Sequence, residues 1–184
     1  MTDPVLFYSA SAALACVLLL GALDKFRDLP GFAAAVSAYE ILPAGIGVPF
    51  ALLFALAEVA AGALLLTPAW QPAGAGLALL VLAMATAGLA FNLARGRRDM
   101  DCGCSGPMSR RPGARGTGLS WWLVARNVAL AAWTAPVLAA SAAGLSRGLL
   151  WTDAASVFGL AASAVALYFT ANHLLASHLK LQAI

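Results

Sequence analysis

Long apolar blocks dominate the chain, and they lack the polar stripe that a half-buried helix of a soluble protein shows. Five of them are long enough, or nearly so, to cross a hydrocarbon core, which needs roughly 20 residues of helix. They cover residues 5–23, 48–66, 73–93, 121–140 and 154–175. Because every backbone amide in lipid must be paired within its own segment, the pattern predicts helices and no open sheet. We expect an all-α integral membrane protein with one membrane domain over residues 1–184.

A shorter apolar segment lies between the first two predicted spans. It runs from Phe32 to Leu42 and ends in the sequence Tyr39-Glu40-Ile41-Leu42-Pro43. Its length is too small for a span, and a proline disrupts a continuing helix. The segment is predicted to form an interfacial or re-entrant helix that Pro43 closes.

Composition supports lipid as the solvent of the outer surface. Hydrophobic residues make up 62% of the chain and charged residues only 10%, whereas soluble domains carry about 25% charged residues. This excludes nucleic-acid binding and most classes of soluble enzyme. The residues from Met1 to Ser9 include Asp3 but no Lys or Arg, unlike the start of a secretory signal peptide, so we expect the first apolar block to be retained.

The basic residues fall mainly on one side of the predicted spans. Nine follow the first, third and fifth spans, whereas Arg147 stands on the other side and Arg126 just inside the fourth span. Lys and Arg are retained in the cytoplasm during insertion, so this bias predicts an outside N-terminus, a cytoplasmic C-terminus and a cytoplasmic loop over residues 94–120. The nine are Lys25, Arg27, Arg95, Arg97, Arg98, Arg110, Arg111, Arg115 and Lys180.

Two cysteines in that loop are the leading candidates for chemistry. Cys102 and Cys104 are separated by Gly103, and a two-residue step spans at most about 7 Å. A disulfide between them would be strained and therefore exchangeable. Neighbouring arginines favour the reactive thiolate, while Asp99 and Asp101 oppose it. Two alternatives stay open: half of a metal site, although the loop offers no third Cys and no His to complete it, and two incidental cysteines.

Cys16 lies inside the first predicted span. A free cysteine in such a position usually behaves as a small buried hydrophobe, and this is the interpretation we favour. The alternative is a third redox partner for Cys102 and Cys104.

Polar residues inside the spans form a second set of candidates. Glu58 lies near the middle of the second span, where a carboxylate is costly unless it is protonated, paired or facing a wet cavity. Lys25, Asn92, Arg126 and Asn127 lie toward the predicted cytoplasmic ends of their spans. We expect these residues to line a polar pocket that opens toward the cysteines. For Lys25 and Arg126 the alternative is extension to the lipid headgroups.

Four local motifs carry a resemblance to a known family. They are Leu23-Asp24-Lys25-Phe26, the stretch from Tyr39 to Pro43, Ala57-Glu58-Val59 with Gly62, and Asp101-Cys102-Gly103-Cys104 followed by Ser120-Trp121-Trp122-Leu123-Val124-Ala125-Arg126-Asn127. With these motifs the chain resembles the MauE family of methylamine utilization proteins, within the broader MauE/DoxX group of redox-associated membrane proteins. The cysteine motif with its downstream Trp-Trp and Arg-Asn pairs is the most specific of the four.

The resemblance implies a fold and a role. The fold would be similar to the four-helix core of DoxX and, more distantly, of vitamin K epoxide reductase, with one C-terminal helix added. The role would lie in the bacterial inner membrane, in processing, transport or disulfide maturation of the disulfide-rich small subunit of periplasmic methylamine dehydrogenase. A periplasmic thioredoxin-like protein of the same pathway would be a partner, and Cys102 and Cys104 would be the exchanging pair.

A periplasmic substrate conflicts with a cytoplasmic cysteine loop. Either the pair relays electrons across the membrane, or the loop lies in the periplasm against the charge bias, which is the signal we follow. Two other functions stay open. One is a non-catalytic assembly or export subunit, and the other is a quinone or small-molecule site among the helices, built on Glu58 and the polar helix ends.

Overall fold

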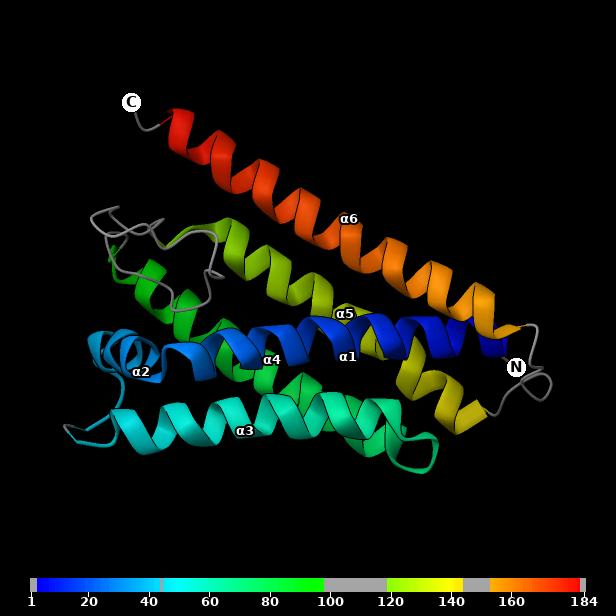
Figure 1. Cartoon of the computed structure of the whole chain (residues 1–184). Coiled ribbons are helices and arrows are strands. Elements are labelled where there is room, and N and C mark those ends of the chain that lie inside the picture. Colours follow the sequence, from blue (N-terminus) through cyan, green and yellow to red (C-terminus); the bar gives the residue numbers. More distant parts are fainter. Residues whose placement is uncertain (1–2, 44, 98–118, 144–152, 183–184) are drawn as a thin grey trace.

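The computed structural model describes residues 3–43, 45–97, 119–143 and 153–182. Within these ranges the chain is entirely helical, and five helices are long and apolar enough to cross a membrane. The protein is therefore a multi-pass membrane protein, as the apolar blocks predict. The elements are α1 (Pro4–Arg27), α2 (Leu29–Ala38), α3 (Gly47–Leu66), the 3-10 helix η1 (Pro68–Trp70), α4 (Gln71–Ala94), α5 (Trp121–Ala143) and α6 (Asp153–Gln182) (Figure 1).

Aspartates and prolines set the starts of the first two helices. Asp3 accepts a hydrogen bond from the backbone N–H of Val5 at 2.8 Å, and Pro4 occupies the first turn of α1. Asp28 accepts from the N–H of Gly31 at 2.9 Å and so separates α2 from α1. The predicted short helix is present, but it ends at Ala38 and not at Pro43. The chain has already left the helix at Glu40, where φ is +52°.

Helix α1 holds the bundle together. It packs against α3, α5 and α6, and α4 packs against both α3 and α5. Figure 1 shows α6 lying along the N-terminal half of α1 and slanting away from the other helices toward its own C-terminal end. The largest buried cluster combines a few long side chains, including Phe7, Leu14, Leu65 and Val137, with alanines that let the helices approach closely.

Helices α1 and α3 approach closely at Gly62. A Cβ atom there would lie 2.7 Å from Cγ of Leu19 and 3.3 Å from the carbonyl oxygen of Ala15. A side chain at this position would require Leu19 to move and the Ala15 carbonyl to give by a few tenths of an ångström, so the position favours a residue without a side chain. The contact fixes how α1 and α3 lie against each other, one turn from Glu58.

One end of the bundle collects the basic residues of the described chain. The end of α1, helix α2, the start of α3, the end of α4, the start of α5 and the end of α6 all lie there (Figure 1). It carries Lys25, Arg27, Arg95 and Arg97, whereas the opposite end carries Asp3 and Asp153. We call it the basic end.

Substitution of Gly62 by Ala should lower the stability of the bundle by about 1–2 kcal/mol, because the new methyl group meets Leu19 and the Ala15 carbonyl. Gly76→Ala is the matched control, since a Cβ at Gly76 meets nothing within 4 Å. Alanine is the better helix former, so the control should be neutral or stabilising. Thermal unfolding of the purified protein in detergent measures both, and equal melting temperatures would contradict the close approach.

Candidate functional site

A buried ion pair joins α1 to α3. Lys25 Nζ lies 2.9 Å from Oε1 and 2.8 Å from Oε2 of Glu58, so the ammonium faces both carboxylate oxygens. Each residue is only 7% exposed. Two opposite charges removed from water stabilise one another strongly only when they are close and well hydrogen-bonded, and this geometry meets that condition. Glu58 therefore has the partner that an intramembrane carboxylate needs.

The side chain of Lys25 extends into the bundle and away from the nearer headgroup layer. Its ammonium lies 3.4 Å from the carbonyl oxygen of Gly21, one turn deeper in α1. The rings of Phe32 and Phe54 lie 5.4 and 5.7 Å from Nζ, within the range of cation–π attraction. The ammonium thus sits among a carboxylate, a carbonyl and two aromatic rings. Extension of Lys25 to the headgroups, the alternative interpretation of the sequence, is wrong.

The ion pair borders a cavity of about 110 Å³ whose lining mixes apolar side chains with charged and amide groups; we call it the polar cavity. Side chains from α1, α3, α4, α5 and α6 line it, so the cavity exists only when all five spans are assembled. Among the lining residues are the ion pair, Asp24, the two amides Asn127 and Asn172, Arg126, and the aromatic residues Phe54, Tyr168 and Phe169.

Arg126 and Asn127 reach this cavity from the first turns of α5. A guanidinium N–H of Arg126 donates to Oδ1 of Asn127 at 3.3 Å, and Asn127 is 4% exposed. Asn92 is fully buried in α4, where its amide donates to the carbonyl of Gly88 at 3.1 Å, but it is not part of the cavity lining. The structure thus brings together four of the five expected pocket residues.

A second polar contact lies directly before residues 98–118, which we call the cysteine segment. Arg97, three residues beyond α4, places Nη2 2.6 Å from Oε1 of Glu40 and donates through Nη1 to the carbonyl of Ala38 at 3.4 Å. Leu119, at the far end of residues 98–118, is buried with Leu89 and Leu93 of α4. Both ends of that segment are therefore anchored at the basic end of the bundle.

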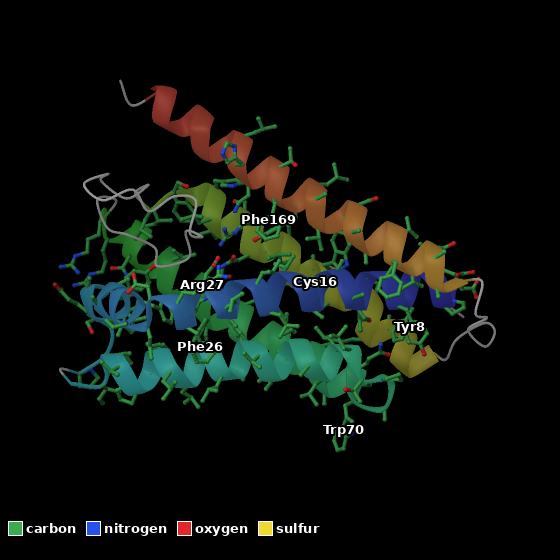
Figure 2. All side chains as sticks on the ribbon, in the orientation of Figure 1. Tyr8, Cys16, Phe26, Arg27, Trp70 and Phe169 are labelled. Atoms are coloured by element: carbon green, nitrogen blue, oxygen red, sulfur yellow. The ribbon has the colours of Figure 1, made fainter. Side chains whose placement is uncertain are left out.

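Cys102 and Cys104 lie outside the described residues. Cys16 is described, and it is an exposed free thiol near the middle of α1 (Figure 2). The expectation that it is buried is therefore wrong. Helix α1 is apolar on all faces, and lipid accommodates a thiol as readily as a protein core does, so the sequence pattern does not indicate which face is buried. Within the described ranges, no three His, Cys, Asp or Glu side chains come together as a metal site.

Several residues of the site were not identified from the sequence. Asn172, Tyr168 and Phe169 of α6 line the cavity, although polar and aromatic residues in that span look like ordinary interfacial residues. The contact between Arg97 and Glu40 joins positions 57 residues apart, for which a single sequence gives no signal.

Comparison with known proteins assigns the chain to a family. Residues 3–141 match the family described as Methylamine utilisation protein MauE. The chain belongs to the MauE family. It is 31% identical to the methylamine utilization protein MauE of Paracoccus denitrificans over 94% of this chain and 88% of that protein. It is also 30% identical to the MauE protein of Paracoccus versutus, over 95% of this chain and 89% of that protein. No solved structure matches.

The buried pair in this MauE-family protein can be tested by a double-mutant cycle. Lys25→Met and Glu58→Met should each lower the free energy of unfolding by about 3–5 kcal/mol, because each leaves one charge buried without its partner. The double variant should recover most of that loss. Arg27→Met is the matched control, since the Arg27 side chain is 59% exposed. Unfolding in a denaturing detergent measures all four variants, and strictly additive losses would refute the coupling.

The contact between Arg97 and Glu40 should make the stability of the fold sensitive to acid. The hydrogen bond from Arg97, and then its positive charge, lower the pKa of Glu40 from its ordinary value. The contact therefore stabilises the fold above the ordinary glutamate pKa and is lost as the pH falls through the lowered value. Melting temperatures of the native protein and of Glu40→Gln should differ near neutral pH and converge in acid. A difference that persists in strong acid would show that another contact is responsible.

Proposed function

We propose that this MauE-family protein is a membrane thiol-disulfide component in the biogenesis of methylamine dehydrogenase. Family membership, shown by the match of residues 3–141, together with the sequence Cys102-Gly103-Cys104, carries the proposal. The client is the disulfide-rich small subunit of that enzyme, and the partner is a periplasmic thioredoxin-like protein of the same pathway. The membrane is the bacterial inner membrane.

The chemistry is thiol-disulfide exchange. In the oxidising direction, a client thiolate attacks one sulfur of the Cys102–Cys104 disulfide, forms a mixed disulfide and releases the other cysteine as a thiolate. A second client thiolate then attacks the mixed disulfide. The client gains a disulfide, Cys102 and Cys104 become two thiols, and two electrons pass from the client to the protein.

The bundle supports this chemistry by holding both ends of the cysteine segment at the end where the polar cavity lies. Arg97 anchors the entry through Glu40, and Leu119 anchors the exit among α4 side chains. Four residues separate Arg97 from Cys102. We assign Glu58, Lys25, Arg126 and Asn127 to a polar pocket beneath the cysteines, and Asn92 to its buried support in α4.

Charge distribution supports an orientation with the N-terminus outside and the C-terminus in the cytoplasm, since the basic end is the one retained inside. In this orientation the exchanging pair starts from the cytoplasmic side, and electrons must cross the membrane to or from a periplasmic client. Exposed Cys16, at mid-height in α1, is a third sulfur between the two faces.

Trapping of the mixed disulfide tests the proposal. The single variants Cys102→Ser and Cys104→Ser should differ: the one that retains the attacked cysteine should accumulate an adduct that reductant releases, because the neighbouring cysteine can no longer displace the client. Nonreducing electrophoresis with mass spectrometry identifies the adduct. Cys16→Ser, which leaves the pair intact, is the matched control.

The double variant Cys102→Ser, Cys104→Ser should fail to support active methylamine dehydrogenase, and full enzyme activity in its presence would overturn the redox role. In intact cells, a membrane-impermeant thiol reagent applied from outside should leave Cys102 and Cys104 unmodified. Rapid modification from outside would reverse the proposed orientation and leave the exchange chemistry in place.

A second candidate function is a non-catalytic assembly subunit that holds the immature dehydrogenase subunit or its partner at the membrane. The favouring observation is that the chain has three cysteines and therefore no second pair to complete a relay. This function requires stable co-purification of the client with the double Ser variant, and no change in the redox state of the loop thiols.

A further inference from the structure

A large apolar groove adjoins the polar cavity. It has a volume of about 510 Å³ and lies between α1, α5 and α6. Val17, Arg126, Leu130, Tyr168 and Asn172 line both the groove and the cavity, so the two hollows share one wall. A partly polar hollow inside the bundle thus lies directly beside an apolar hollow nearer the outside, with these five side chains between them.

The groove has the character of a site for a hydrocarbon tail. Its walls are Ala, Val, Leu and Trp side chains, among them Leu14 of α1, Trp133 of α5 and Leu160 of α6. Leu160 and Leu167 are also exposed, so the groove edge reaches the lipid-facing surface. From Trp122 to Trp133 the groove follows α5 over 11 residue steps, which is about 16 Å of helix.

The cavity has the character of a site for an uncharged ring. Two acidic and two basic side chains line it, namely Asp24, Glu58, Lys25 and Arg126, so its formal charges cancel. A charged headgroup would disturb that balance, whereas a neutral head would not. Phe54, Tyr168 and Phe169 add aromatic faces, and Figure 2 shows Phe169 on the side of α6 that faces the other helices. Planar rings pack well against such faces.

Hydrogen-bond donors line both hollows. The indole N–H of Trp122 is buried, lines the side of the groove and has no acceptor among the described residues. Arg126 is a donor with no acceptor capacity, and the amides of Asn127 and Asn172 contribute further donors. These groups suit a head that carries carbonyl oxygens.

We propose that the cavity and the groove together bind a lipid-soluble quinone, with its ring in the cavity beside Lys25 and Glu58 and its tail in the groove between α5 and α6. The ligand reaches the site sideways from the bilayer, past the exposed edge formed by α6. This binding goes beyond the exchange function and does not depend on Cys102 or Cys104.

Binding of decylubiquinone to the full chain in lipid nanodiscs tests the proposal. Quinones quench tryptophan fluorescence, and Trp122 and Trp133 line the groove. Ala164→Phe, which puts a ring into the groove, should weaken binding about tenfold or more, because the tail loses its space. Ala162→Phe is the matched control: it places the same side chain two residues away on α6 at an exposed position outside the groove lining, and should leave binding unchanged.

Ala129→Phe fills the same groove from α5 and should repeat the loss, which keeps the test valid if α6 shifts in the first variant. Excess decanol or phosphatidylcholine should not displace the quinone. Equal displacement by either would show that the groove takes any bilayer chain and would overturn the proposal, as would equal affinities for Ala164→Phe and Ala162→Phe. The Cys102→Ser, Cys104→Ser variant should bind like the native chain, so failure of the exchange function and failure of quinone binding are separate results.

Discussion

The buried contact between Lys25 and Glu58 is the constraint around which the rest of the structure is arranged. Two charges in a medium of low polarity must meet closely, so α1 and α3 can take only one register. The close approach at Gly62 lies one turn away on α3 and permits that register. Around the pair, the other spans supply aromatic rings, amides and a guanidinium, and the short helix α2 supplies Phe32.

The polar cavity, the ion pair and both anchors of the cysteine segment belong to the same end of the bundle. The charged groups inside the spans, Lys25, Glu58 and Arg126, lie in this half of the bundle, whereas the buried polar residues of the other half, Ser9, Ser11, Gln71 and Thr134, are uncharged. A membrane protein that needed only to be held in the bilayer would have no reason to concentrate these costly groups at one level. The concentration indicates a site in a protein whose family is described as methylamine utilisation protein MauE.

Hydropathy was sufficient to predict the five spans, because the cost of exposing backbone and polar groups to lipid applies to every residue of a segment. It also identified Glu58 as a residue in need of a partner. The identity of that partner could not be predicted, since Lys25 lies 33 positions away and equally fits a headgroup contact. The face of α1 that carries Cys16 was predicted wrongly for a related reason: with apolar residues on every side, only the contacts between helices decide which side is covered. The contribution of α6 to the cavity depends on the angle at which α6 crosses the other helices, and that angle likewise could not be predicted from the sequence.

The depth of the Lys25 ammonium has a consequence for how the chain enters the membrane. Helix α1 is synthesised before α3, so for a time its lysine has no carboxylate to meet and must remain near the water layer. Only when α3 arrives can the side chain swing inward beside Gly21 and take up the position found in the finished bundle. The charge of Lys25 thus keeps this side chain at the membrane surface until α3 is in place. The buried pair can form only after both helices have been inserted.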